Sequence, residues 1–568
     1  MIVPMKKIHL VVQSKDAGLA LDQLRELGSL HVEPLRTVAD NQLDVLRGKA
    51  ETLARAIEAV KKTPVAKVEQ EACADVDAKI SEITALIQEI ERLENSIAQR
   101  GVRIKKWALW GNFKPGDVRF LSERGIFVHL YEIPVKQKVE IPAGAYMETV
   151  NTFGGIRRCV VVMRENIQLP YDRVYLPEIS MQEKMDLQSK EQRQREGLRE
   201  QIKSSQRYLG SFEQALAAVR EDVRLKEVAV GAMVEGEFTV LKGFCPQDRL
   251  DQLQQTARKA HWGVLIEDVT EDDPAPTLLR NPKWVEVIKP LFGVINVLPG
   301  YREADVSLVM LLFFTLFVGI LIGDVGYGAV ILLGAAGAHV AMRKKIADQT
   351  FFILVYLLCC STIGWGVLTG VYFGQSWLAG RIAPVLPWLN ESTNIQMFCF
   401  LLGAIHLGIA HLWRTVKAAP SLEMLKEFGW FLLVVVMFFM ANNLVLDQPL
   451  PKFVMPVFIV GVALIVLFPK PNMAPTFPLD VVSCFTDVVS YIRLYAVGLA
   501  TVAVADAANE MSIGWVIFLH TLNITLSAMA IMVHGLRLNV LEFSGHLGMT
   551  WAGVKYEPFC RQKQTNTE

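Results

Sequence analysis

The sequence predicts a mainly helical membrane protein, in which a cytoplasmic antiparallel coiled-coil rod with two small α/β lobes precedes an eight-helix transmembrane domain. Lys, Arg, Asp and Glu make up about 29% of residues 1–300 but only about 11% of residues 301–568. Apolar stretches long enough to cross a bilayer recur in the second part. Heptad repeats with charged flanks recur in the first. These three observations together predict the fold class.

Composition also excludes several classes of protein. A chain that is 52% hydrophobic, with its charge concentrated in one half, is neither a soluble globular enzyme nor a disordered protein. A net charge of zero gives no indication of a nucleic-acid partner. The eight cysteines form no CxxC pair and no Cys/His ligand spacing, so neither a metal site nor a disulfide framework is expected.

Two segments of the soluble half carry heptad repeats. The first covers about residues 38–105, and the second covers about 181–226, where apolar positions follow a 4-3-4-3-4-3-4 spacing. Two such segments are expected to be the arms of one antiparallel hairpin. Strand-like runs around them predict α/β lobes formed by residues 1–37 with 228–275, and by residues 110–180.

The soluble half shows no motif of a catalytic or nucleotide-binding site. It contains no GxxxxGK[ST] loop, no GxGxxG loop, no GxSxG elbow and no HExxH pair. Residues 1–300 are therefore expected to form a structural strut with no catalytic site and no cofactor.

Eight apolar stretches in residues 301–568 are predicted to span the membrane. They are residues 306–322, 325–341, 351–373, 395–413, 427–446, 453–468, 480–508 and 513–545. An even number of spans places both ends of the region on one side. The loops assigned to that side hold ten Lys or Arg against two on the other, and the apolar run at the N-terminus is too short for a signal peptide. The N-terminal domain and the C-terminus are therefore expected to be cytoplasmic.

The last two spans are longer than the bilayer requires, so they are expected to tilt or protrude. Their polar residues fall on one side of each helix at 100° per residue. In the seventh span these are Asp480, Ser483, Thr486, Asp487, Ser490 and Arg493; in the eighth they are His520, Asn523, Ser527, His534 and Arg537. An arginine in a bilayer stays charged and needs water or a carboxylate. The stripes therefore indicate an ion path, or else an internal salt bridge that joins Arg493 to Asp487 or Arg537 to Glu542.

Four further positions are candidates with open alternatives. Asp324, within the sequence GDVGYG at the outer membrane edge, takes part either in a tight helical turn or in ion uptake. His406 and His411 in the fourth span are either packing residues or functional ones. Glu427, at the start of the fifth span, is added as a candidate carboxylate.

The chain resembles subunit I, also called subunit a, of V-type and archaeal-type rotary ATPases and ATP synthases, in the prokaryotic form. The resemblance covers nearly the whole length. It rests mainly on YIRLYAVGLA at 491–500, HGLRLNVLEF at 534–543 and GDVGYG at 323–328.

The resemblance implies a role for each of several residues. Arg493 corresponds to the essential arginine that faces the rotor ring, with Arg537 as its companion and His534 as a neighbouring polar residue. Asp480, Ser483 and Glu542 fall where the family lines the cytoplasmic half-channel, and Asp324 where it lines the outer one. Eukaryotic relatives have a glutamate where this chain has Ser527 and a histidine where it has Thr501.

The resemblance also implies partners and a location. The expected partners are a rotor ring of proteolipid c (K/L) subunits, peripheral-stalk E/G-type heterodimers, the central-stalk cap subunit (C/d) and membrane lipid. The expected location is the prokaryotic cytoplasmic (inner) membrane. ATP chemistry would belong to another subunit, so this chain is expected to be a non-catalytic stator part of an H⁺ or Na⁺ translocase. The alternatives are a secondary transporter or channel with a coiled-coil regulator, expected to show repeated halves and broken helices, and a membrane-anchored scaffold.

Overall fold

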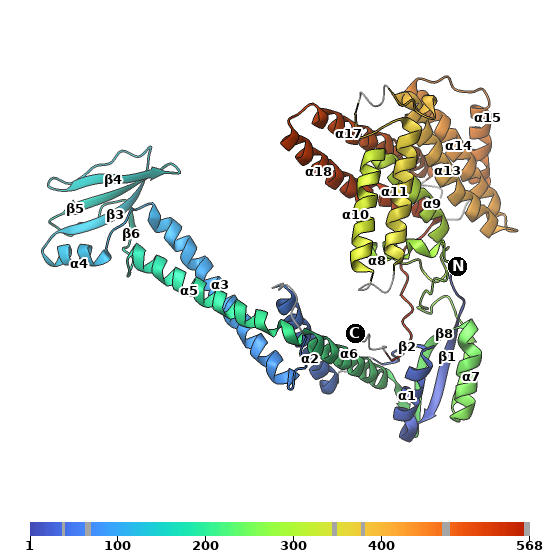
Figure 1. Cartoon of the computed structure of the whole chain (residues 1–568), viewed down its shortest axis with the longest axis horizontal. Coiled ribbons are helices and arrows are strands. Elements are labelled where there is room, and N and C mark those ends of the chain that lie inside the picture. Colours follow the sequence, from blue (N-terminus) through green and yellow to red (C-terminus); the bar gives the residue numbers. More distant parts are fainter. Residues whose placement is uncertain (37–39, 63–69, 344–348, 376–380, 469–476, 562–568) are drawn as a thin grey trace. The chain divides into compact units, whose positions relative to one another are not determined.

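The computed structural model describes residues 1–36, 40–62, 70–343, 349–375, 381–468 and 477–561 (Figure 1). The chain divides into two compact units. One contains Met1–Val11, Leu27–Val32 and Lys242–Phe559, and the other consists mainly of Glu33–Leu241. A domain boundary near residue 300 stays a prediction, because the unit that holds the apolar helices also takes in residues from the soluble half.

The coiled-coil part consists of four helices. They are α2 (Asn41–Lys61), α3 (Val76–Ala108), α5 (Met181–Ser204) and α6 (Leu209–Gly231). Helix α2 packs against α6, and α3 packs against α5 (Figure 1). Two ion pairs along each helix pair show that the helices are antiparallel. Arg47 meets Glu227 and Lys61 meets Glu213 in the first pair. In the second, Glu94 meets Arg199 and Arg100 meets Glu191. The buried apolar residues include Leu53, Ile57, Ile83, Ile90, Ile202, Phe212 and Leu216.

Each predicted arm is thus interrupted, rather than one continuous helix. Helix α2 ends at Lys61, and α3 begins only after Asp75, whose carboxylate accepts the Ala78 N–H (2.9 Å). A 3₁₀ turn at Ser205–Tyr208 separates α5 from α6. Residues 38, 39 and 63–69 of the predicted first arm lie outside the described residues.

An antiparallel four-stranded sheet lies between α3 and α5 in the sequence. Its order is β4 (Tyr146–Phe153), β5 (Ile156–Met163), β3 (Phe127–Pro134) and β6 (Asp172–Val174), and α4 (Pro115–Glu123) precedes it. Tyr131, Ile133, Cys159 and Val161 form its buried core.

A second sheet has the order β2 (His31–Glu33), β8 (Phe238–Pro246), β1 (Met5–Gln13), β9 (Gly263–Asp268), and β7 (Met233–Glu235) also pairs with β8. Helix α1 (Ala17–Leu27) follows β1 in the sequence, and α7 (Leu250–Lys259) follows β8. Strands β1 and β9 are antiparallel, with Ile8 opposite Ile266.

The segment after the last helix returns to this sheet and its neighbours. Ala552 forms a parallel bridge with Leu298, and Lys555 forms one with Thr277. Further on, the Tyr556 hydroxyl donates to the Ser29 carbonyl (2.7 Å) and the Phe559 N–H donates to the Leu30 carbonyl (2.8 Å).

The remaining helices are mostly apolar. They are α8 (Lys289–Ile295), α9 (Ser307–Ile322), α10 (Val325–Met342), α11 (Thr350–Thr369), α13 (Ser392–Ala418), α14 (Glu423–Leu446), α15 (Val454–Leu467), α16 (Phe477–Ser490), α17 (Ile492–Asn509), α18 (Ile513–Ala530) and α19 (Ser544–Leu547). Among the described residues, six helical segments are long and apolar enough to cross a membrane: α10, α11, α13, α14, Phe477–Asn509 and Ile513–Leu547. Helices α9 and α15 are apolar but shorter. The count of eight spans stays a prediction.

The last two segments are long, with 33 and 35 residues. Two π-helical turns, Ile531–Gly535 and Leu538–Phe543, interrupt the second of them. A π turn holds more residues than an α-turn. It therefore rotates the side chains that follow it away from the positions that 100° per residue predicts, so the predicted stripe of the eighth span does not continue through these turns.

Candidate functional site

A polar cavity of about 370 Å³ lies among α13, α14, α16 and the last helical segment. Its lining residues are His411, Arg414, Lys426, Glu427, Trp430, Asp480, Ser483, Cys484, Asp487, Arg537, Leu541, Glu542, Gly545 and His546. Seven predicted site residues from four separate spans meet here: His411, Glu427, Asp480, Ser483, Asp487, Arg537 and Glu542. The cavity thus gathers charged groups among largely apolar helices.

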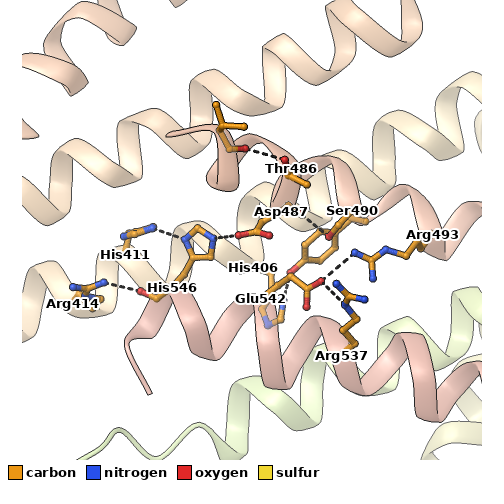
Figure 2. Close-up of polar contacts among 12 residues, drawn as sticks. His406, His411, Arg414, Thr486, Asp487, Ser490, Arg493, Arg537, Glu542 and His546 are labelled. Carbon is orange, nitrogen blue, oxygen red and sulfur yellow. Dashed lines mark hydrogen bonds and ion pairs between the residues drawn. The ribbon is translucent and has the colours of Figure 1, made fainter. Parts of the chain in front are cut away.

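Two arginines converge on one carboxylate at this cavity (Figure 2). The Glu542 Oε1 atom lies 3.1 Å from Nη2 of Arg493 and 3.2 Å from Nε of Arg537. The Glu542 side chain is 4% exposed, whereas those of Arg493 and Arg537 are 27% and 52% exposed. One negative charge faces two positive ones, so the cluster keeps one excess positive charge near the surface of the chain.

This arrangement decides between the predicted salt bridges. The structure contains the Arg537–Glu542 pair, but Arg493 pairs with Glu542 and not with Asp487. The Asp487 carboxylate contacts His546 Nε2 instead, at 3.0 Å. Glu542 reaches Arg493 from within the Leu538–Phe543 π turn, whose geometry an ideal helix does not have.

Four titratable side chains form a line along the other wall of the cavity, and Figure 2 shows three of them, His411, His546 and Asp487. His411 Nδ1 lies 3.6 Å from Glu427 Oε2, beyond hydrogen-bond distance, whereas His411 Nε2 lies 2.9 Å from His546 Nδ1. The line continues from His546 to Asp487. Arg414 flanks it, donating to Glu427 Oε1 (2.8 Å) and to the His546 carbonyl (3.0 Å).

His406 lies apart from this line and packs among aromatic rings. Its ring stacks between Phe313 and Phe543, with centroid distances of 3.9 and 4.4 Å. Its Nδ1 lies 2.8 Å from the Tyr491 hydroxyl. The ring is fully buried and does not line the cavity. The geometry therefore favours the packing interpretation for His406.

Asp324 caps a helix. Its Oδ1 accepts from the N–H groups of Gly326 (2.6 Å) and Tyr327 (3.1 Å) at the start of α10, and its Oδ2 accepts from Gly374 N–H (3.2 Å). Gly323 just before it has φ +59°, which ends α9. The carboxylate is fully buried, so the contacts favour the turn interpretation.

Asn523 and Ser527 belong to a second polar cluster next to Asp324. Asn523 Nδ2 donates to the Tyr327 hydroxyl (2.9 Å) and to the Thr501 carbonyl (2.8 Å), while the Ser527 hydroxyl donates to the Asn523 carbonyl (2.8 Å). The ring of His520 lies 2.7 Å from the same Tyr327 hydroxyl. None of these residues lines the cavity of Asp487 and Glu542.

Several residues of the site escaped sequence reasoning. His546 lies one residue beyond the predicted end of the eighth span at residue 545. Arg414 and Lys426 were counted only as loop charges that orient the membrane region. His534, a predicted site residue, does not line the cavity, and its buried Nδ1 has no hydrogen-bond partner within the described part of the chain.

Comparisons with known proteins identify the family. No family model matches the chain. V-type ATP synthase subunit I 1 of Treponema pallidum is 30% identical over 98% of this chain and 100% of its own length. V-type ATP synthase subunit I of Borreliella burgdorferi is 28% identical over 99% and 100%.

A crystal structure of the cytoplasmic N-terminal domain of subunit I, a homologue of subunit a of V-ATPase, covers 46% of this chain and 99% of its own length. Its identity is 11% and its TM-score is 0.24, too distant to support an argument about fold. The full-length likeness to the treponemal protein is sufficient by itself: the chain belongs to the V-type ATP synthase subunit I family.

Proposed function

We propose that this chain is the membrane stator subunit of a rotary V/A-type ATPase or synthase, with two ion half-channels and an arginine that faces the carboxylates of a rotor ring. The observation that carries the proposal is the convergence of Arg493 and Arg537 on Glu542. A single arginine paired with Glu542 would be neutral and would need no further partner. The excess positive charge here is complementary to an acidic group on another subunit.

Arg493 would act on the ring carboxylate through its fixed charge. A guanidinium stays protonated at any physiological pH. In surroundings of low dielectric, a nearby positive charge favours the ionised form of a carboxyl group, so a ring carboxylate that arrives beside Arg493 would release its ion. The same charge would repel cations and so prevent a direct leak between the half-channels.

The cavity lined by Asp480, Ser483, Asp487 and Glu542 is our candidate for the cytoplasmic half-channel. The outer half-channel is proposed at the end of the spans marked by Asp324. The buried cluster of Tyr327, His520 and Asn523 lies at that end. Because Asp324 already accepts three N–H groups, we propose that it holds the shape of this end.

The remaining parts fit a stator. Eight spans with a cytoplasmic N-terminal domain and C-terminus in the inner membrane would place the paired helices α2, α3, α5 and α6 in the cytoplasm. That domain would bind E/G-type peripheral stalks and extend toward the C/d cap subunit. It would resist torque without catalysing a reaction, since ATP chemistry would belong to another subunit. No observation favours a secondary transporter, which would leave the full-length family likeness unexplained.

The test is Arg493→Ala in the assembled complex, with Arg343→Ala, at the end of α10, as the matched control. ATP-driven ion pumping into vesicles should fall to background in Arg493→Ala, while the proteolipid ring still co-purifies with the chain. The control should pump at the parental rate. Pumping that persists in Arg493→Ala would overturn the assignment.

A further inference from the structure

The ring of His406 contacts both chain segments that carry the Arg493–Glu542 pair (Figure 2). It stacks on Phe543, the residue after Glu542, with ring centroids 4.4 Å apart and an angle of 3° between the ring planes. Its Nδ1 atom lies 2.8 Å from the hydroxyl of Tyr491, which precedes Arg493 by two residues. His406 belongs to α13, so a third helix joins the two segments whose side chains meet.

Tyr491 occupies a joint between two helices, since α16 ends just before it and α17 begins just after it. The Tyr491 N–H donates to the Val488 carbonyl (3.4 Å), and the Leu494 N–H donates to the Tyr491 carbonyl (3.0 Å). Both bonds span three residues, where an α-helix spans four. The direction of the Arg493 side chain therefore depends on how this joint is held.

The joint is tightly enclosed by α13 and α9. The side chains of Tyr491 and His406 are both fully buried. A Cβ atom at Gly403, one turn earlier on α13, would lie 2.7 Å from the Tyr491 ring, so only glycine lets the helix approach this closely. Phe313 of α9 also stacks on the His406 ring, with centroids 3.9 Å apart. The plane of the imidazole is thus fixed, and with it the atom that the Tyr491 hydroxyl contacts.

We propose that His406 is a positioning residue for the arginine that faces the rotor ring. Through Tyr491 it fixes the joint that precedes Arg493. Through Phe543 it fixes the π turn that brings Glu542 to the same place. This proposal rests on the proposed function, because that function gives Arg493 its role.

This role differs from that of the residues lining the polar cavity. His406 does not line that cavity. Its buried Nε2 atom has no hydrogen-bond partner within the part of the chain that the structure describes. His406 would therefore carry no ion, and would act only through the residues that its ring contacts.

A displaced Arg493 would fail in a specific way. Its fixed charge is proposed to prevent a direct leak between the half-channels. If the guanidinium shifts, ions leak back while ATP is still hydrolysed, so fewer ions accumulate per ATP. A histidine that only filled space would behave differently, because its loss would reduce the number of intact complexes. Ion transport and ATP hydrolysis would then fall in proportion.

Two variants remove the hydrogen bond and keep the aromatic rings. His406→Phe leaves the buried Tyr491 hydroxyl without its partner, and Tyr491→Phe removes only the hydroxyl oxygen. In the whole complex reconstituted into vesicles, each should lower the number of ions moved per ATP at least about threefold, because small displacements of a positioned group are costly. Acidification and ²²Na⁺ uptake are both followed, so that either ion is counted.

The double variant tests whether the two residues act through one bond. Since both substitutions remove the same interaction, their combination should lose no more than the worse single variant. A loss equal to the product of the two single losses would overturn the proposed connection.

His339→Phe is the matched control. His339 of α10 also stacks on an aromatic ring, that of Phe352 at 4.5 Å, and its Nδ1 lies 2.8 Å from the Tyr356 hydroxyl. These three residues belong to α10 and α11, not to the segments that carry Arg493 and Glu542. The control should move as many ions per ATP as the parental complex.

Hydrogen exchange of the full chain in detergent tests the joint without ion transport, and decides for a variant that does not assemble. The Leu494 N–H should exchange faster in both single variants than in the parental chain at the same pH. Unchanged exchange at Leu494, or a parental number of ions per ATP in either assembled variant, would overturn the positioning role of His406. The stator assignment would still be decided separately, by Arg493→Ala.

Discussion

The Nη2 atom of Arg493 lies 3.1 Å from Oε1 of Glu542, and these residues are 49 positions apart in the sequence. The contact joins the start of α17 to a π turn in the last helical segment. It holds a partly exposed arginine in a fixed direction without neutralising the cluster, because Arg537 shares the same oxygen. Glu542 is thus a positioning residue for the proposed ring-facing charge.

Glu542→Gln should therefore leave two guanidinium groups without their shared anion. We expect the free energy of unfolding to fall by about 1–3 kcal/mol. This is less than the cost of breaking a fully buried ion pair, because both arginines are partly exposed. ATP-driven pumping should fall by at least about tenfold. Thermal unfolding of the purified complex and acidification assays measure the two effects. Glu510→Gln, at an exposed position after α17, is the control, and equal behaviour of both variants would contradict the positioning role.

Gly403→Ala should disturb the same region by steric overlap. A Cβ atom at Gly403 would lie 2.7 Å from the ring of Tyr491, which is fully buried two residues before Arg493. Overpacking of this kind costs about 1–3 kcal/mol. The unfolding midpoint should drop, together with pumping. Gly337→Ala meets no atom within 4 Å and should change stability by less than about 0.5 kcal/mol. If Gly403→Ala changed neither the unfolding midpoint nor pumping, the Tyr491 ring must be able to shift and make room for the added Cβ atom.

Tyr327→Phe should weaken the second polar cluster. The substitution leaves the Asn523 amide and the His520 ring without the hydroxyl that they contact at 2.9 and 2.7 Å. Buried polar groups that lose a partner cost about 1–3 kcal/mol. Hydrogen exchange should rise in the first turn of α10 and around His520 and Asn523 in α18. Tyr356→Phe removes the hydroxyl that bonds His339 in the last turn of α10 and should leave the first turn of α10 and the middle of α18 unchanged. A similar effect of the two variants there would argue against the cluster.

Acid should loosen the pairing of α3 with α5. The hydrogen bond from Arg100 lowers the pKa of Glu191 below its usual value. Because the folded pKa is the lower one, the stabilisation is present above the unfolded pKa of about 4.3 and is lost as pH falls through the folded value. An exposed pair contributes at most about 1 kcal/mol.

Hydrogen exchange of α3 and α5 in the full chain at pH 7 and at pH 4 measures this effect. Because the intrinsic exchange rate falls with pH, the two conditions are compared as protection factors, and protection should be lower at pH 4 in the parental protein. In Glu191→Gln the contribution of this pair should be absent, so the acid-induced loss of protection should be smaller. An equal loss of protection in both proteins would show that other carboxylates dominate.

Periodicity predicted which residues share a helix face but not which side chains meet. The 100° rule grouped Asp480, Ser483 and Asp487 correctly, because α16 is a regular helix, and all three line one cavity. It did not predict the Arg493–Glu542 contact, because this contact depends on a π turn that the spacing of polar and apolar residues does not predict.

The long-range contacts of His546 could not be predicted from the sequence either, because they depend on where the last helix ends. His546 meets Asp487 and His411 because the chain continues as a helix through Leu547. The apolar run ends earlier, so hydrophobicity alone placed His546 outside the span. In the soluble half, the heptad spacing predicted which helix faces pack together. It did not predict that α2 ends at Lys61 and that α3 begins only after Asp75, because the spacing of apolar residues carries no information about where the chain changes direction.

The extended residues that follow the last helix give it a tether. Bridges from Ala552 to Leu298 and from Lys555 to Thr277, with the bond from Phe559 to Leu30, tie it down within about a dozen residues. A sideways force on the helix that carries Arg537 would then be transmitted through this short, hydrogen-bonded segment, which has little length over which it could bend. In the proposed stator, this attachment would keep the Arg537 helix in position against a sideways load from a rotating ring.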